Sequence, residues 1–171
     1  VIPCGAIATA GFIPPLDTPL CASDSHQFIN TTTPPQITNF VWDFGYGGDS
    51  VYVKDPKHKF PGGGTYVVTL SAGDSLGCFD DTSIAVTIED VPIPVWDWTM
   101  GCAPDYATFF HDSSWIASTG AITRYKWDFG IEGAQHDTSD VTDPSWTYPK
   151  GGPYDVTLYL WSQKGCMDSL Q

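Results

Sequence analysis

The feature that most constrains this fold is an internal repeat, because several blocks of the sequence return in the same order. Residues 40–45, Phe-Val-Trp-Asp-Phe-Gly, recur 85 positions later as Tyr-Lys-Trp-Asp-Phe-Gly at 125–130. Residues 63–70, Gly-Gly-Thr-Tyr-Val-Val-Thr-Leu, recur 88 positions later at 151–158 as Gly-Gly-Pro-Tyr-Asp-Val-Thr-Leu. Since the offset changes only between blocks, the insertions fall in loops, and the chain is predicted to fold as two related units.

Each repeat has the patterning of short strands. Residues 66–70 and 82–88 alternate apolar and polar side chains with a period of two, and Pro, Gly and Asp clusters between such runs mark turns. About seven strands per repeat suit a sandwich of two antiparallel sheets. We therefore predict an all-β chain of two tandem immunoglobulin-like domains, residues 1–91 and 92–171. The proline-containing segment 89–94 is expected to be a short, stiff linker.

The second repeat is shorter than the first at its C-terminal end. After Cys78 the first repeat continues through a strand from Asp81 to Ile88, whereas five residues follow Cys166. We expect the second domain to lack its last strand. We also expect the chain to be a piece of a longer protein that carries further repeats.

Composition and charge exclude several classes of partner. Of the 20 acidic residues 18 are Asp, which favours turns over helices. The net charge is −13, and the single Arg and six Lys provide no cationic surface for nucleic acid or anionic lipid. No apolar run approaches the roughly 20 residues that a membrane-spanning helix needs. Nucleic-acid binding and direct membrane insertion are therefore not expected.

Four motifs, each occurring twice in a fixed order, carry a family resemblance. Trp-Asp-Phe-Gly, then Asp-Pro-x-His-x-Phe, Gly-x-Tyr-x-Val-Thr-Leu and Gly-Cys resemble the PKD domain, an immunoglobulin-like sandwich of extracellular proteins. The Gly-Cys variant is similar to PKD repeats of large bacterial surface adhesins, including those of gliding bacteria. The resemblance implies a secreted or cell-surface location. It also implies neighbouring domains of one long chain, and surface glycans or proteins, as partners.

Calcium is the only cofactor to consider. The family pattern usually continues as Trp-Asp-Phe-Gly-Asp-Gly, but Tyr46 and Ile131 replace the second Asp, which some members use for calcium. Four other aspartates flank one turn region in each repeat, where carboxylates can either bind calcium or cap turns in solvent. These four are Asp49, Asp55, Asp137 and Asp143.

The cysteines predict disulfides. Cys21 and Cys102 occupy matching positions in the two repeats, as do Cys78 and Cys166. We predict two intradomain bonds, Cys21–Cys78 and Cys102–Cys166, which are typical of an oxidising compartment. A zinc site would require Cys-x-x-Cys pairs or histidines at ligand spacing, and the sequence has neither. Cys4 is left over.

No catalytic group is predicted, although residues 73–77, Gly-Asp-Ser-Leu-Gly, match two hydrolase patterns. A nucleophile elbow requires a strand-turn-helix context with a His and an acid. Here the segment lies between two predicted strands, and Gln163 is aligned with Ser75. A hairpin turn is the better interpretation. His58 aligns with Trp146, so a structural role is expected for it.

The tryptophans divide into core and surface candidates. Trp42 and Trp127 have the place of the core tryptophan of such sandwiches, which we favour over a carbohydrate platform. Trp115 has no counterpart, because residues 109–122 exceed the matching segment 28–37 by four residues. We consider Trp115 a candidate ligand contact at a domain end, with packing on its own loop or on the linker as the alternative.

The sequence as a whole predicts a non-catalytic extracellular spacer or adhesion module of a repetitive bacterial surface adhesin. The alternative is an accessory region of a secreted hydrolase, either passive or binding polysaccharide, whose catalytic domain lies outside this segment. Because function depends on sites carried by a fold, the fold class does not choose between them.

Overall fold

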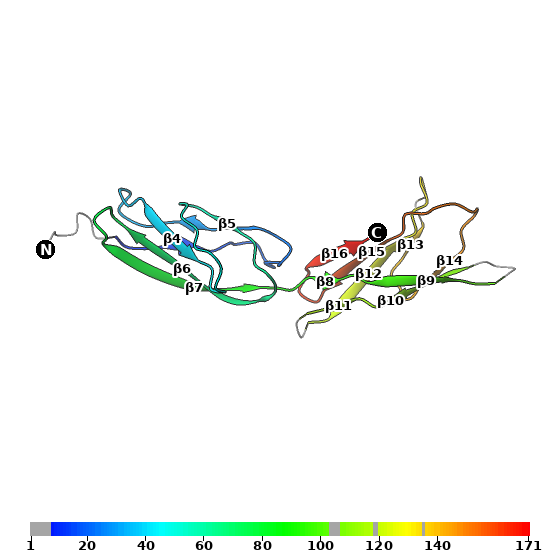
Figure 1. The fold of residues 1–171 in the computed structure, drawn as a ribbon. Helices are drawn as coiled ribbons and strands as arrows, with labels where there is room; N and C mark the ends of the chain where they lie inside the picture. The colour runs from blue at the N-terminus through cyan, green and yellow to red at the C-terminus, as the bar shows by residue number, and fades with distance from the viewer. Residues whose placement is uncertain (1–7, 103–106, 118–119, 135) are drawn as a thin grey trace. The chain divides into compact units, whose positions relative to one another are not determined.

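The computed structural model describes residues 8–102, 107–117, 120–134 and 136–171. The chain divides into two compact units, Val1–Glu89 and Asp90–Gln171 (Figure 1). Each unit is described by itself.

The first unit is built from antiparallel pairings of seven described strands. The order β4-β6-β7 forms its main sheet, while β2 pairs with β5 and β1 with β3. Its strands are β1 (Phe12–Ile13), β2 (His26–Gln27), β3 (Ile29–Asn30), β4 (Asn39–Asp43), β5 (Lys57–His58), β6 (Gly64–Gly73) and β7 (Phe79–Ile88). The long β6–β7 hairpin pairs residue for residue from Gly64↔Ile88 to Gly73↔Phe79.

The second unit repeats this arrangement with additional strands. The order β13-β12-β15-β16 forms one sheet and β14-β10-β9 another, while β8 pairs with β11. Its strands are β8 (Pro92–Ile93), β9 (Trp96–Met100), β10 (Thr108–Asp112), β11 (Trp115–Ile116), β12 (Ile122–Asp128), β13 (Thr138–Ser139), β14 (Ser145–Trp146), β15 (Thr157–Ser162) and β16 (Met167–Leu170).

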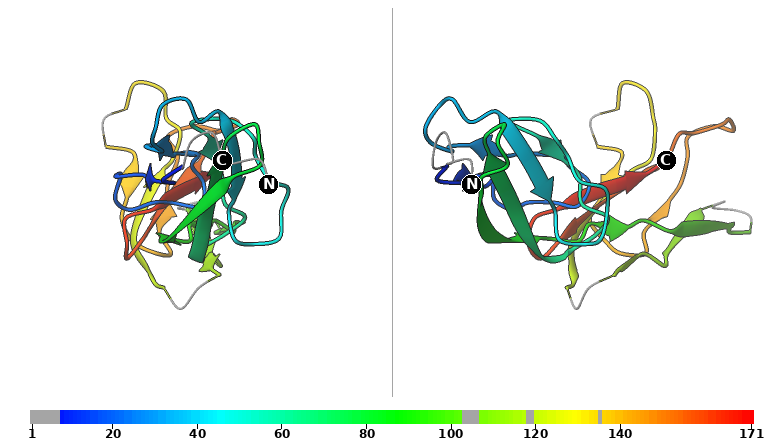
Figure 2. Two further views of the ribbon diagram at one scale, coloured as in Figure 1. Left: turned by 90° about the vertical axis from the view of Figure 1, so that its left-hand side faces the viewer. Right: turned by 60° about the vertical axis from the view of Figure 1, so that its left-hand side comes forward.

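The described residues form strands, turns and irregular segments and no helix, as the views of Figure 2 also show. Accordingly, nothing in the described part of the chain qualifies as a membrane-spanning helix. The predicted all-β class with two immunoglobulin-like sandwiches is confirmed. The preference for Asp over Glu, together with many Thr and Val residues, explains why short strands and turns prevail over helices.

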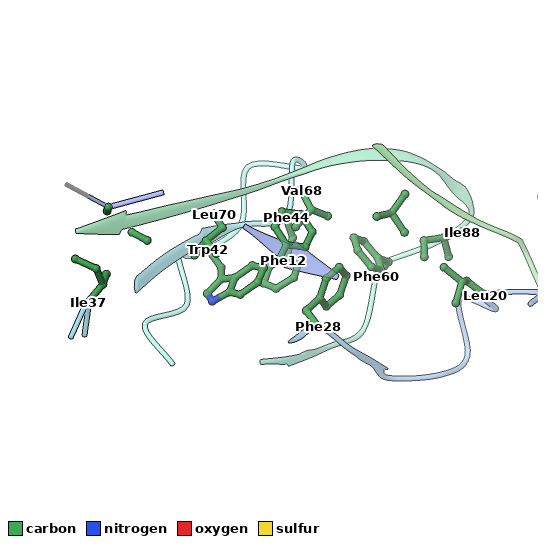
Figure 3. Close-up of a cluster of buried hydrophobic side chains, with 13 residues drawn as sticks. Phe12, Leu20, Phe28, Ile37, Trp42, Phe44, Phe60, Val68, Leu70 and Ile88 are labelled. Atoms are coloured by element: carbon green, nitrogen blue, oxygen red, sulfur yellow. The ribbon is translucent and has the colours of Figure 1, made fainter. Parts of the chain in front are cut away.

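The core of the first unit is a cluster of aromatic rings (Figure 3). Trp42 is fully buried and packs edge-on against Phe12, with 5.1 Å between ring centroids. The ring centroid of Phe28 lies 6.0 Å from that of Trp42 and 5.3 Å from that of Phe44. The Trp42 indole N–H donates to the carbonyl oxygen of Val53 at 2.9 Å, so the buried polar atom is satisfied.

The second unit has an equivalent core. Trp127 is fully buried, lies 5.4 Å from Phe110 and 5.5 Å from Trp96, and donates its indole N–H to the Thr142 carbonyl oxygen at 3.2 Å. The core interpretation of Trp42 and Trp127 is confirmed, and these two rings are not carbohydrate platforms.

The Trp-Asp-Phe-Gly motif makes the same turn in both units. The Asp43 carboxylate accepts the Gly45 amide hydrogen at 2.8 Å, and Asp128 accepts that of Gly130 at 3.0 Å. Gly45 and Gly130 have φ values of 79° and 70°, which favour glycine. Each aspartate therefore caps the turn that its glycine permits.

The structure corrects one detail of the repeat alignment. The sequence alone pairs Phe28 with Phe109, but the core equivalent of Phe28 is Phe110. The amide of Phe28 donates to the Pro56 carbonyl oxygen, and that of Phe110 donates to Pro144. Phe109 is 44% exposed. Since neighbouring residues of a strand face opposite sides, a slip of one residue exchanges a core ring for a surface ring.

The prediction that the second domain lacks its last strand is wrong, because β16 pairs with β15 as β7 pairs with β6. The two last strands nevertheless differ in length. β7 has 10 residues and β16 has 4. The strand that precedes them differs in the same way, because β6 begins at Gly64 whereas β15 begins at Thr157, five residues beyond the matching glycine, Gly152. The pairing between the last two strands is therefore shorter in the second unit.

Candidate functional site

The hydrolase-like segment is a hairpin turn. Asp74 lies between β6 and β7, and its carboxylate accepts the backbone amides of Leu76 at 2.9 Å and Cys78 at 3.1 Å. The segment leads from one strand directly into the next, without the helix that a nucleophile elbow requires. Ser75 thus has the setting of a turn residue.

The predicted calcium ligands are mostly engaged with backbone amides. Asp55 accepts the amide hydrogen of Asn30 at 2.8 Å, and Asp143 accepts that of Asp112, also at 2.8 Å. Both aspartates tie a loop to a neighbouring strand. The same bond in both units indicates a structural role, which is the turn-cap interpretation of these residues.

Asp137 and Asp49 are not equivalent. Asp137 is buried, and its carboxylate accepts the Ile131 amide at 2.8 Å, whereas Asp49 is exposed. Within the described ranges, no three His, Cys, Asp or Glu residues gather as a metal site would require. The structure therefore does not bring the four aspartates together as a calcium site.

The cysteines correct the predicted pairing in the second unit. Cys21, Cys78 and Cys166 are disulfide-bonded, but Cys102 is a free, exposed thiol. The predicted Cys102–Cys166 bond is therefore wrong. Matching positions in a repeat show that two residues have related environments, but they do not show that both are bonded.

The predicted Cys21–Cys78 bond is also wrong, because the two residues lie at opposite ends of the first unit. The backbone of Cys21 forms a β-bridge with that of Glu89, just beyond the end of β7. Cys78 immediately precedes β7. The ten residues of β7 span about 33 Å at the usual strand rise. A disulfide requires Cα atoms within about 7 Å. Each of these cysteines is therefore bonded, but not to the other.

Peptide mapping under non-reducing conditions tests both corrections. After alkylation without reductant, we expect the label on Cys102 and on none of Cys21, Cys78 and Cys166, because only the Cys102 thiol is free among the described cysteines. No Cys21–Cys78 or Cys102–Cys166 linked peptide should appear. Detection of either linked peptide in the folded protein would contradict this assignment.

His58 has the structural role expected of it. Its ring stacks on Phe44 with 3.6 Å between centroids, and Trp146 stacks in the same way on Phe129 at 4.5 Å. Tyr46 and His58 share a hydrogen bond of 3.1 Å. Burial, and secondarily the neighbouring His26, lowers the pKa of His58. The folded first unit thus favours the neutral ring.

The lowered pKa of His58 predicts a pH dependence. The unfolded chain takes up a proton on this ring near pH 6.5, whereas the folded chain does so at lower pH. The thermal midpoint of the first unit should therefore fall as the pH is lowered below about 6.5. His58→Trp, which copies the ring of the second unit, should weaken this fall. An equal slope in both proteins between pH 7 and 5 would assign the effect to other groups.

Trp115, the predicted ligand contact, is 52% exposed. Its strand β11 pairs with β8, where Trp115 lies opposite Ile93 of the predicted linker segment. The backbone of Trp115 therefore packs on the linker segment, which is the alternative role considered for it. About half of its side chain is nevertheless open to solvent. A role in binding stays a prediction.

A second aromatic surface, which the sequence analysis missed, is an apolar groove in the second unit. Its volume is about 710 Å³. Trp96, Trp98 and Met100 line it from β9, and Thr108 and Phe110 line it from β10. The segment between β14 and β15 completes it. The residues of this segment in the groove are Tyr148, Lys150, Gly151, Gly152, Pro153, Tyr154 and Val156.

One buried side-chain oxygen of the described groove residues makes no hydrogen bond. The Tyr148 hydroxyl is buried and makes no hydrogen bond, while its ring stacks on Tyr154 at 3.9 Å. Burial raises the pKa of Tyr148 to about 12, with smaller contributions from Tyr154 and Asp137. The Tyr154 hydroxyl donates to the carbonyl oxygen of Lys150 at 2.7 Å. The groove is thus mainly apolar, with one unused hydroxyl.

A sequence signal for this groove is the presence of Trp98 and Met100 at every second position of one strand. The pairs Phe12↔Asn30 and Trp96↔Asp112 hold the same place in the two units, so Phe12 is the counterpart of Trp96. In this register, Pro14 and Leu16 stand where the second unit has Trp98 and Met100.

Comparison with protein families gives one match in each unit. The family model described as "PKD domain" matches residues 15–88 and residues 92–171. The two matches leave out only the first fourteen residues and the residues between the units.

Individual relatives match shorter stretches or show low identity. The chain is 43% identical over 54 residues to the "Pre-pro-metalloprotease PrtV" of two Vibrio cholerae strains, a stretch of 32% of this chain and 5% of those proteins. Among solved structures, the PKD1 domain of Vibrio anguillarum Epp is 22% identical, covers 50% of this chain and 96% of its own, and has a TM-score of 0.42. A carbohydrate-binding module of the β-sandwich superfamily is 13% identical, covers 92% and 85%, and has a TM-score of 0.46.

Proposed function

Because this chain belongs to the PKD domain family over both of its units, we propose that it is a non-catalytic spacer region of a longer secreted or cell-surface protein. Among such proteins we favour a repetitive bacterial surface adhesin. The observation that carries this proposal is the duplication of one scaffold. What the two units share is the core and its supporting turns, whereas the most exposed aromatic groups differ between them.

The shared features are those that stabilise a domain. The buried Trp42 and Trp127, the capped glycine turns and the loop-binding Asp55 and Asp143 recur in both units. β7 ends at Ile88 and β8 begins at Pro92, so only three residues separate strands of the two units. Bonded cysteines suit an oxidising extracellular environment. A repeated, covalently strengthened scaffold is what a spacer requires.

The alternative is an accessory region of a secreted hydrolase. The stretch of 54 residues that is 43% identical to a pre-pro-metalloprotease favours this alternative. In such a protein the PKD units would accompany a catalytic domain elsewhere in the chain. Both proposals agree that the residues of this chain perform no catalysis.

A replacement experiment in the full-length protein tests the spacer role. Residues 8–171 are exchanged either for two unrelated β-sandwich domains of equal length or for a Gly/Ser linker. A spacer should tolerate the unrelated sandwiches but not the flexible linker, because only folded domains keep a fixed span. The measurement is attachment of cells that display the protein.

The same variants separate the competing proposals. If the unrelated sandwiches abolish attachment although the protein reaches the surface, this chain binds a ligand and is more than a spacer. If attachment is unchanged in every variant, but cleavage of a macromolecular substrate falls while cleavage of a small substrate persists, the accessory role in a hydrolase replaces the adhesin.

A further inference from the structure

The outer face of one sheet in the second unit carries a row of cations. β12, β15 and β16 are neighbours in this sheet (Figure 1). On β12, Trp127 is buried in the core and Tyr125 packs against it. Neighbouring residues of a strand face opposite sides, so Arg124 and Lys126 lie on the outer face, where both are exposed. β12 thus contributes two cations to this face.

The next strand places an aromatic ring beside each cation. Trp161 of β15 pairs with Arg124, whose guanidinium carbon lies 4.0 Å from the centre of the indole ring. Tyr159 pairs with Lys126, whose ammonium nitrogen lies 5.8 Å from the centre of the phenol ring. On β16, Met167 lies opposite Trp161 and is 44% exposed. The face therefore has an apolar row beside the cationic row, and cation–π attraction orients the two cations.

These two cations have no carboxylate partner among the described residues. The chain contains 20 acidic residues and seven Lys or Arg residues, so a partner would be expected for each cation. Yet Arg124 and Lys126 form no ion pair or hydrogen bond with any residue that the structure describes. Asp128, two positions further along the same strand, accepts the amide hydrogen of Gly130 instead. The N–H donors of both cations are thus available to an external anion.

The first unit has neither the cations nor the rings at the matching places. In the register of the two sheets, Asn39 and Val41 stand in place of the two cations. Ser71 and Gly73 stand in place of the two rings. Because the first unit forms the same sheet without these groups, the fold does not require them. The cations and rings are an addition to the shared scaffold.

We propose that this face binds an acidic polysaccharide, whose carboxylates contact the two cations while its sugar rings pack on the apolar row. A guanidinium group binds a carboxylate through two parallel N–H donors. The C–H surface of a sugar ring gains free energy when it leaves water for an aromatic side chain. The proposal goes beyond the spacer role, which requires no ligand, and rests on the extracellular location in the proposed function.

The arrangement favours a polysaccharide over an acidic peptide or a nucleic acid. The backbone groups of β12, β15 and β16 already pair with one another, so a peptide laid on this face would find no backbone partners. Nucleic acid requires many cations along its phosphates, whereas this face has two in a chain of net charge −13. Salt screens charges beyond about 8 Å, so the two cations act on carboxylates in direct contact.

Binding of polygalacturonate, a polymer of a uronic acid, tests the proposal. Arg124 is the only arginine of the chain, so its side-chain Nε–H signal is identified directly in an NMR spectrum. We expect polygalacturonate to shift this signal and the indole signal of Trp161. Fully methyl-esterified polygalacturonate, which has the same backbone without the charge, should bind at least about tenfold more weakly, since each carboxylate would lose its charged donor. Affinity electrophoresis in gels that contain the polymer gives the affinities.

The test variants copy residues that the first unit carries on the same sheet. Arg124→Asn with Lys126→Val should keep the fold and weaken binding of polygalacturonate at least about tenfold. Lys57→Ala with Lys59→Ala is the matched control, because it removes two exposed cations with the same spacing from the first unit. This control should leave the affinity within about twofold, as is usual for surface charges away from a site. Thermal unfolding checks the fold of each variant.

Four results would overturn the proposal. An Arg124 signal that the polymer does not shift would show that the ligand does not contact this face. An equal loss of affinity in both double variants would show that only net charge matters. Poly-aspartate that binds as tightly, and with the same dependence on Arg124 and Lys126, would make the partner an acidic protein. Unchanged binding with a lowered thermal midpoint in Arg124→Asn with Lys126→Val would mean that the cations only stabilise the sheet. None of these results affects the spacer role, because the replacement experiment measures attachment by the whole protein.

Discussion

Replacing Trp127 with alanine is expected to destabilise the second unit by about 3–5 kcal/mol, the usual range for removing a buried aromatic ring. The ring is fully buried, contacts Phe110 and Trp96, and bonds to the Thr142 carbonyl oxygen. The substitution opens a cavity and also leaves that carbonyl without its donor. Chemical unfolding followed by far-UV circular dichroism measures the change.

Trp115→Ala is the matched control for this prediction. It removes the same type of ring from the same unit, but Trp115 is 52% exposed. Its effect should stay within about 0.5 kcal/mol, as is usual for surface positions. A loss as large as that of Trp127→Ala would mean that Trp115 supports the fold, and its role as a candidate ligand contact would then be withdrawn.

Gly130→Ala is expected to cost the second unit about 2–5 kcal/mol, through two separate effects. The residue has a φ of 70°, a conformation that alanine rarely adopts. An added Cβ would also lie 2.5 Å from the Asp155 carbonyl oxygen, where only movement of the backbone can relieve the overlap. Thermal or chemical unfolding of the variant gives the total cost.

Gly133→Ala separates these two effects. Gly133 has a similar φ of 79°, but an added Cβ would meet nothing within 4 Å. This control should cost only the conformational part, about 1–2 kcal/mol. If the two variants lose the same stability, the close approach of Gly130 to Asp155 contributes nothing, and the conservation of glycine between the two repeats at this turn rests on φ alone.

Local patterns predicted the features that depend on neighbouring residues. Strand periodicity and the preference for Asp gave the all-β class, and recurrence of the Trp-Asp-Phe-Gly block indicated two sandwiches with a core tryptophan in each. The turn at 73–77 was predicted because a nucleophile elbow needs a helix after it, and the sequence shows none. The role of Asp43 and Asp128 as turn caps also follows from local chemistry, since a carboxylate reaches amides two residues away.

Two predictions failed because they required distances across the fold. The alignment of Phe28 with Phe109 was wrong by one residue, and only packing shows that Phe110 enters the core. The cysteine pairings were inferred from matching positions, but the length of β7 separates Cys21 from Cys78, and Cys102 is not bonded. Sequence symmetry cannot measure these distances.

The sequence by itself determined that two β-sandwich units form. Hydrophobic periodicity and turn residues depend on a few neighbouring positions, and both patterns occur twice in the chain. Tertiary structure decided which surfaces remain open. The groove lined by Trp98 and Tyr148 forms because β9 and the segment between β14 and β15, which lie far apart in the sequence, meet in the fold. Strand pairing joins residues far apart in the chain, so whether an aromatic side chain becomes core or surface depends on a partner that its own neighbours do not specify.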